Sequence, residues 1–182
     1  MSPPPVMLSR RQVGFGALMA AGLAASGTGR AAAAAGQHDV PIATELAMRV
    51  TLIIDRPTQE LGITPYGARR RVTVGSGSFE GPRIRGKVLD GADWQLQRTD
   101  GLTWLEAEAM LQADDGTHIY LRDRGLMNLY QPDREDIYWR TAADFEAPEG
   151  PHDWLNRSLF IGTYEAYDGE AGALTLAFHR LV

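Results

Sequence analysis

Six polar side chains have the types that acid–base chemistry on a small molecule requires. Two are candidate general acids or bases and four are candidate substrate-binding groups: Asp93 and Glu146, then Arg140, Tyr120, Asn156 and Arg83. A guanidinium can bind a carboxylate or phenolate through two parallel hydrogen bonds, and a semi-buried carboxyl can transfer a proton. The set predicts a cofactor-independent lyase or isomerase, such as a decarboxylase, acting on a small aromatic or phenolic acid. Arg140, or alternatively Arg83, would bind the anionic group.

Structural roles are the competing interpretation for each of these residues. Arg140 and Glu146 would then form an ordinary ion pair, and Asn156 would fix the turn before the last hairpin. A second function also stays open, a non-catalytic exported carrier of a small hydrophobic ligand. A third is a structural role through an oligomeric face, and a homo-oligomer is compatible with every alternative.

Motifs for other chemistries are missing from the sequence. The chain has no cysteine, which excludes disulfides, thiolate metal sites and a cysteine nucleophile. Its four histidines are far apart, without metal-ligand spacing. No G-x-S-x-G elbow, phosphate-binding loop or dinucleotide fingerprint occurs. We therefore expect neither a metal nor a cofactor, and a small molecule as the partner.

The elements that must position the candidate residues are predicted to be strands. About nine short segments with alternating apolar residues follow one another, separated by Gly, Pro and Asp turn signals. No window keeps a 3.6-residue period, although 103–113 (TWLEAEAMLQA) mixes helix formers with strict alternation. We expect an all-β chain, a single antiparallel β-barrel of about eight to ten strands (calycin-like), because closure removes free sheet edges.

Residues 83–98 are predicted to form a β-hairpin around an Asp90-Gly91 turn. Such a turn pairs Val88 with Asp93 and places both on one face with Gln95. The basic residues of this segment then share the other face with Trp94. Asp93 is left among apolar neighbours, where burial would raise its pKa unless a partner compensates. The alternative is that Asp93 caps backbone N–H groups near the turn.

The register of the next hairpin, around 114–116, can be predicted from the charges of the residues that would pair. A three-residue loop, 114–116, pairs Glu108 with Arg122 and Glu106 with Arg124, whereas a two-residue loop would oppose Glu108 with Asp123. The longer loop is therefore predicted, with Gly116 at positive φ. One face is then aliphatic and the other polar. Either the polar face is a solvated exterior, or it is the wall that binds the ligand.

The first 35 residues have the pattern of an export signal. Arg10 and Arg11 precede an apolar run and an alanine-rich tail, which predicts a cleavable twin-arginine signal peptide over 1–35 and a periplasmic or secreted protein. An exposed lead-in (36–45) and the barrel domain (46–182) would follow. After position 35, 15 basic and 23 acidic residues leave a net charge of −8, which disfavours nucleic acid and anionic membrane as partners.

Four segments resemble an uncharacterised bacterial and fungal family, domain of unknown function 3237. They are 62–95 (GITPYGARRRVTVGSGSFEGPRIRGKVLDGADWQ), 114–125 (DDGTHIYLRDRG), 137–146 (IYWRTAADFE) and 154–163 (WLNRSLFIGT). The resemblance extends over roughly 46–182 and implies a compact antiparallel β-barrel without a recognised cofactor. The family's usual Pro-Gly-Gly-Ala-Asp-Trp element is one residue shorter here, at Asp90–Trp94. The resemblance does not imply a particular reaction.

Overall fold

A computed structural model describes residues 41–54, 56–129 and 137–182. The predicted signal peptide and the first part of the predicted lead-in lie outside the described residues. Ten strands and one short 3-10 helix follow in chain order: β1 (Thr44–Ile53), β2 (Gln59–Thr64), β3 (Gly67–Val74), β4 (Ser76–Glu80), β5 (Arg85–Gln97), β6 (Thr103–Ala113), β7 (His118–Asn128), β8 (Tyr138–Glu146), η1 (Asp153–Arg157), β9 (Phe160–Asp168) and β10 (Ala173–Leu181). Within these ranges, no helix is long and apolar enough to cross a membrane.

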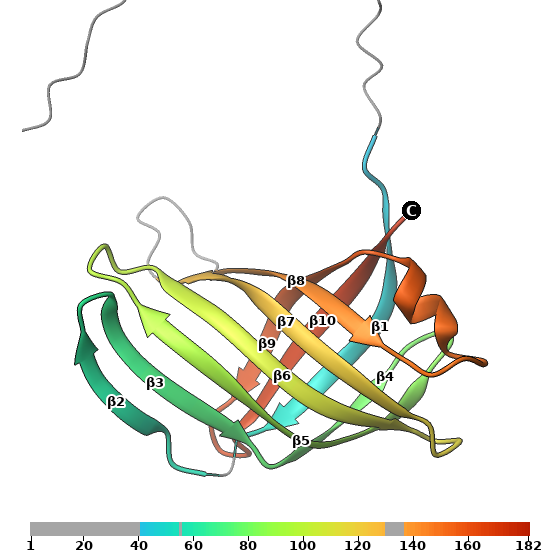
Figure 1. Ribbon diagram of the computed structural model, residues 1–182, viewed down its shortest axis with the longest axis horizontal. Coiled ribbons are helices and arrows are strands. Elements are labelled where there is room, and N and C mark those ends of the chain that lie inside the picture. The colour runs from blue at the N-terminus through green and yellow to red at the C-terminus, as the bar shows by residue number, and fades with distance from the viewer. Residues whose placement is uncertain (1–40, 55, 130–136) are drawn as a thin grey trace, which may run out of the picture. The chain divides into compact units, whose positions relative to one another are not determined.

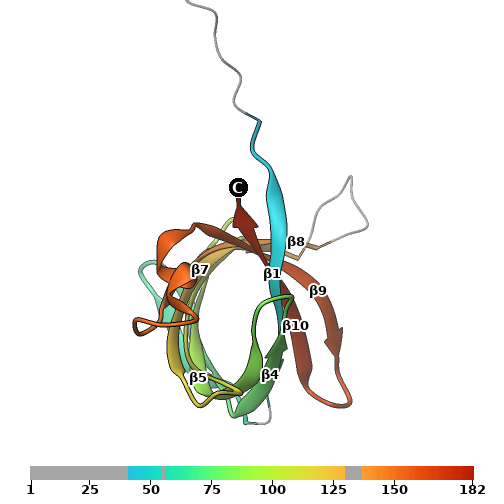
Figure 2. The same ribbon diagram turned by 90° about the vertical axis from the view of Figure 1, so that its right-hand side faces the viewer.

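Eight of the strands close into an antiparallel barrel. Neighbouring strands run in the order β4, β1, β10, β9, β8, β7, β6 and β5, and β5 pairs with β4 to complete the ring. Viewed nearly end on, the strands form this ring in Figure 2. The two extra strands, β3 and β2, continue the sheet beside the second half of β5. The prediction of a single antiparallel barrel is confirmed.

The predicted Asp90-Gly91 hairpin is wrong, because residues 85–97 form one continuous strand. β5 pairs with β4 through Arg85–Val88 and with β3 through Gly91–Gln97, and a β-bulge lies between Val88 and Asp90. A bulge adds one residue to one strand, so side chains five positions apart return to the same face. Val88 and Asp93 therefore both point inward, as the hairpin would have placed them.

The β6–β7 hairpin has the predicted register. Glu108 lies opposite Arg122 and Glu106 opposite Arg124. The loop at 114–116 closes through a hydrogen bond from the Gly116 N–H to the Ala113 carbonyl, and Gly116 has a φ of +89°. The aliphatic side chains of both strands are mostly buried inside the barrel, and the charged ones face outward except Asp123, which is buried.

Gly116→Ala is expected to destabilise the protein by about 1–2 kcal/mol, since an L-residue at this φ is strained. A Cβ there would meet no atom within 4 Å, so the cost comes from the backbone alone. Thermal or urea unfolding measures it. Gly169→Ala, in the β9–β10 turn and without a positive φ, is the matched control and should be nearly neutral. Equal stability of the two variants would contradict the prediction.

One end of the barrel is filled by large apolar side chains. Phe145 packs edge-on against Phe160 and Phe178, with ring centroids 4.9 and 5.7 Å apart. η1 contributes Trp154 and Leu155 to this cluster and lies beside the end of β8, at the edge of this end of the barrel (Figure 1). Because the interior is packed at this end, the interior cavity lies toward the other end.

Candidate functional site

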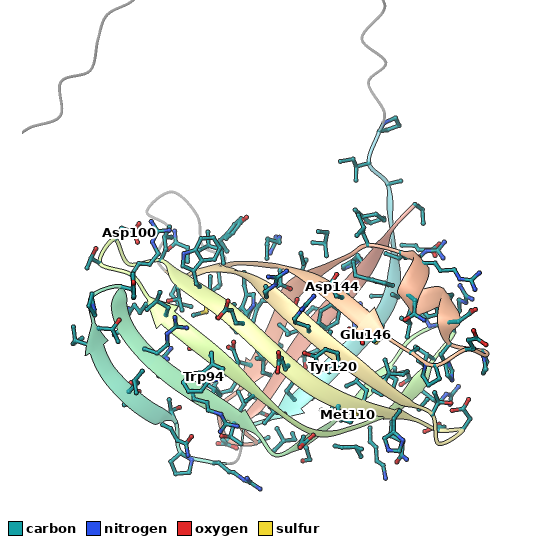
Figure 3. All side chains as sticks on the ribbon, viewed as in Figure 1. Trp94, Asp100, Met110, Tyr120, Asp144 and Glu146 are labelled. Atoms are coloured by element: carbon teal, nitrogen blue, oxygen red, sulfur yellow. The ribbon has the colours of Figure 1, made fainter. Side chains whose placement is uncertain are left out.

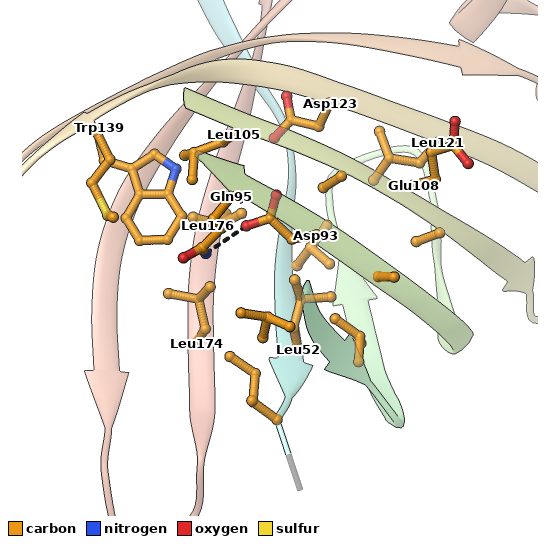
Figure 4. A pocket seen from close by; sticks show the side chains of 18 of the residues that line it. Leu52, Asp93, Gln95, Leu105, Glu108, Leu121, Asp123, Trp139, Leu174 and Leu176 are labelled. Atoms are coloured by element: carbon orange, nitrogen blue, oxygen red, sulfur yellow. Dashed lines mark hydrogen bonds between the residues drawn. The ribbon is translucent and has the colours of Figure 1, made fainter. Parts of the chain in front are cut away.

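A cavity of about 330 Å³ occupies the other half of the barrel. This volume is at the lower end of the range of small-molecule sites. Most of its wall is aliphatic, supplied by residues of six strands, and Leu129 and Tyr167 are exposed at its rim. Besides the exposed Glu108 at its border, five polar or amphipathic side chains that are at least partly buried interrupt the aliphatic wall: Arg70, Asp93, Gln95, Asp123 and Trp139. Figure 4 shows four of them by label, together with the surrounding leucines.

The two carboxyl groups come from strands two apart in the sheet. Asp93 on β5 lies opposite Ala107 on β6, and Ala107 lies opposite Asp123 on β7. Residues in register across neighbouring strands point to the same face. The small side chain of Ala107 leaves both carboxyl groups room to project into one space (Figure 4).

Asp93 is held by a short chain of hydrogen bonds. Arg70 Nε donates to Gln95 Oε1 at 2.7 Å, which fixes the amide so that Gln95 Nε2 donates to Asp93 Oδ2 at 2.7 Å. The backbone N–H of Glu106 donates to Asp93 Oδ1 at 3.1 Å. Burial raises the pKa of Asp93, and these donors and the Arg70 charge oppose that effect. The donors favour the ionised form of Asp93, but burial outweighs them, so its pKa lies above the ordinary value of 3.8.

The burial of the Asp123 carboxyl group is offset by much weaker hydrogen bonding than that of Asp93. It is 4% exposed, and burial raises its pKa to about 7, with smaller contributions from the negative charges of Asp93 and Asp144. The nearby Thr141 hydroxyl opposes this shift. However, Asp123 Oδ1 and Thr141 Oγ1 are both buried without a well-formed hydrogen bond among the described residues. Asp123 therefore keeps its proton up to near neutral pH.

The outer face of the sheet carries two of the residues singled out in the sequence. Glu146 and Tyr120 lie opposite each other on β8 and β7 and project away from the barrel interior (Figure 3). The exposed Arg122–Asp144 ion pair, with 3.2 Å between Nη2 and Oδ2, lies beside them. The polar face of the β6–β7 hairpin is thus the solvated exterior, and Glu146 is not brought to Asp93.

The three other predicted binding residues also lie outside the cavity lining. Arg140 donates to the carbonyl of the preceding residue, and its guanidinium lies 5.6 Å from the Tyr138 ring centre. Arg83 is 4.4 Å from the centre of the Trp154 ring, at the packed end. Asn156 in η1 makes two 2.8 Å hydrogen bonds to the backbone of Ala147. Each residue therefore has a structural partner, and the structure does not assemble the predicted anion site.

Sequence reasoning missed Asp123, Arg70, Gln95 and Trp139 as members of the site. A signal for Asp123 existed, because it has the same alternation as Ile119 and Leu121 on the aliphatic face of this hairpin. Gln95 likewise shares the face of Asp93. Arg70 had no such signal, since it lies within three consecutive arginines whose inward member depends on the β3–β5 register.

Metal ligation finds no support in the part of the chain that the structure describes. No group of three or more histidine, aspartate or glutamate side chains there could hold a metal ion. The donor set of the cavity, two carboxyl groups with an amide, an indole and a guanidinium, is suited to hydrogen bonding and proton transfer.

Solved structures with the same fold come from bacteria and a fungus. A protein of Acinetobacter baumannii described as β-barrel-like is 26% identical, with a TM-score of 0.72 over 80% of this chain and 99% of that one. A protein described as an enzyme, from Penicillium herquei, superposes with a TM-score of 0.64 over 81% of this chain and 99% of that one. At 18% identity it shows likeness of fold alone.

Sequence comparison finds relatives that are themselves uncharacterised. A UPF0311 protein of Rhodopseudomonas palustris is 36% identical over 109 residues, which cover 53% of this chain and 71% of the relative. The model of the family described as protein of unknown function (DUF3237) matches residues 42–180, nearly all of the described barrel. The resemblance noted from the four sequence segments is thereby confirmed, and the chain belongs to the DUF3237 family.

Proposed function

We propose that the protein is a cofactor-independent lyase or isomerase that transfers a proton on a small, largely apolar molecule bound inside the barrel. One observation carries the proposal. Two carboxyl groups face one cavity in different surroundings: Asp93 accepts hydrogen bonds from Gln95 and the Glu106 N–H, whereas burial raises the pKa of Asp123 to about 7. Pairs of titratable groups whose pKa values are pushed apart by their environments serve as acid and base in known active sites.

The roles follow from the hydrogen bonds. Asp93, which accepts from Gln95 and the Glu106 N–H, is the general base. Asp123, buried without a donor of good geometry, is the general acid. These two residues replace the pair Asp93 and Glu146 that was predicted from the sequence.

The substrate class predicted from the sequence was a small aromatic or phenolic acid. The aliphatic wall suits the aromatic part of such a molecule. Among the described residues that line the cavity, Arg70 is the one basic side chain, so it takes the place of Arg140 and Arg83 as a candidate partner for an acid group. Export to the periplasm or beyond, with a signal peptide removed, remains our proposal from the sequence.

The test uses a panel of small compounds in D₂O: acetophenone, cyclohex-2-enone and 4-hydroxybenzoate. We expect proton nuclear magnetic resonance to show deuterium incorporation, double-bond shift or loss of CO₂ with at least one of them. The double variant Asp93→Asn/Asp123→Asn should lack this activity. The variant Asp90→Asn, which changes an exposed aspartate on the same strand, should retain it.

The second candidate function is a non-catalytic carrier, favoured by the mostly aliphatic lining. It predicts binding of the same compounds without any proton transfer, and equal binding by the double variant. Binding combined with no chemical change across the panel would support the carrier and overturn the enzyme.

A further inference from the structure

Three buried polar atoms on the adjacent strands β7 and β8 have no hydrogen-bond partner among the described residues, and two of the three belong to residues that line the cavity. They are Trp139 Nε1 and Thr141 Oγ1 on β8 and Asp123 Oδ1 on β7. Buried polar groups in native proteins are nearly always paired, so each unpaired group calls for an explanation. Trp139 and Asp123 both line the cavity, and Figure 4 shows them projecting into the same space.

The indole of Trp139 is held in place from one side. Its ring stacks on Tyr164 of β9, with centroids 5.8 Å apart and planes inclined by 16°. An indole N–H can only donate a hydrogen bond. A donor that is buried, oriented by stacking and left unpaired in a ligand-sized cavity is suited to a hydrogen-bond acceptor on the ligand.

We propose that the cavity ligand carries a carbonyl oxygen, which Trp139 Nε1–H and the Asp123 carboxyl group bind together from adjacent strands. The class is therefore a ketone or aldehyde on a small apolar ring or chain. This inference rests on the proposed function and deepens it, since it names the substrate group on which the two carboxyl groups act.

The proton-transfer step balances without any further reactant. The Asp93 carboxylate takes the proton from the carbon beside the carbonyl, and the electrons of that C–H bond form the C=C bond. The C=O π electrons move to oxygen, where Trp139 N–H and the Asp123 O–H donate hydrogen bonds to the developing negative charge. Asp93 then returns the proton to a conjugated carbon, which gives isomerisation, or first exchanges it with solvent and delivers a deuteron to the same carbon, which gives exchange. A carboxylic acid kept neutral by an apolar site is a known donor to such oxygens.

Protonation of Asp123 sets the pH range in which it can donate. The charged groups around it are Asp93 on β5 and Arg70 on β3 across the cavity, with Asp144 on the outer face of β8. Two tyrosines of β9, Tyr164 and Tyr167, contribute phenol groups. The cavity-lining residues of β1, β6 and β10 are uncharged, apart from the exposed Glu108 on β6. Donation by Asp123 should fade as its proton is lost near neutral pH.

The experiment compares acetophenone with ethylbenzene, which has nearly the same shape without the oxygen. The full chain is labelled with ¹⁵N in its tryptophan side chains, and Trp139→Phe assigns the Trp139 resonance. We expect acetophenone to shift this indole N–H resonance and ethylbenzene to leave it in place. At pH 5.5 acetophenone should bind about tenfold more tightly, as one satisfied buried hydrogen bond allows.

Two variants and pH separate a binding role from a merely structural one. Trp139→Phe should lose most of the preference for acetophenone while keeping its affinity for ethylbenzene. In the wild type the preference should fall as pH rises to 8.5, whereas Asp123→Asn, whose amide can donate at every pH, should keep it constant. Equal binding of the two probes or an unmoved indole resonance would each overturn the proposal.

Failure of this inference and failure of the proposed function can be told apart. A preference for acetophenone without deuterium incorporation into its methyl group would leave carbonyl recognition standing and overturn proton transfer. Proton transfer on other compounds of the panel, with no preference for acetophenone over ethylbenzene, would overturn carbonyl recognition alone.

Discussion

Replacing Asp93 by asparagine is expected to slow proton transfer on a responsive ketone by about 10²–10⁴-fold, the usual contribution of a positioned general base. The amide cannot accept a proton from carbon, although it can keep one of the hydrogen bonds that hold Asp93. Deuterium incorporation measured at saturating ketone reports the rate. Affinity for the ketone should change little, because Asp93 acts on the proton that is transferred.

The pH dependence of this rate should be bell-shaped. Activity requires Asp93 without its proton and Asp123 with its proton, so the rate rises as the pair first ionises and falls as pH passes about 7. In Asp123→Asn the fall at high pH should disappear, because the amide does not titrate. Asp90→Asn should keep the wild-type rate and profile. An Asp93→Asn variant with the wild-type rate would remove the general base from the mechanism.

Asp123→Asn is expected to make the protein more stable at alkaline pH. The pKa of Asp123 rises from its ordinary 3.8 to about 7 on folding. Between these values the folded protein binds more protons than the unfolded chain, so its free energy of unfolding falls as pH rises, and levels off above pH 7. The full shift corresponds to about 4 kcal/mol. The asparagine variant has no ionisable group at this position, so its stability is not lowered in this way.

Urea unfolding at several pH values measures the effect. The stability gain of Asp123→Asn over the wild type should grow from about 1 kcal/mol at pH 4.5 to about 3–4 kcal/mol at pH 8.5. The control Asp90→Asn changes an exposed aspartate and should stay within about 0.5 kcal/mol of the wild type throughout. A gain that does not vary with pH would contradict the assignment of a buried, protonated Asp123.

The predictions for the rate of proton transfer and for the stability of Asp123→Asn together describe a trade-off between activity and stability. A carboxyl group buried with only weak compensation destabilises the fold at neutral pH, and such costs are commonly retained at functional sites. The ion pair Arg122–Asp144 on the outer face is solvated, and pairs of this kind contribute little to stability. This difference is consistent with the proposed function of the barrel interior.

The alternation of apolar residues determined the strands and the faces of most of them. The charge pairs Glu106–Arg124 and Glu108–Arg122 determined the register of the β6–β7 hairpin, since a shift by one residue would have opposed like charges. Asp93 was also placed on the inner face correctly, even though the turn assumed for it is a bulge. A two-residue turn and a one-residue bulge would both place Val88 and Asp93 on the same face, so the local pattern of residues could not distinguish them.

Only the tertiary structure decided which polar residues meet. Arg70, Asp93, Asp123 and Trp139 come from four strands, and their proximity depends on closure of the ring and on the cross-strand registers of β3, β5, β7 and β8. The same registers place Glu146 and Tyr120 on the outer face, although their residue types suit catalysis equally well. Residue type and spacing along one strand determine a face, whereas a site assembled across a barrel is determined by long-range pairing, which local sequence does not encode.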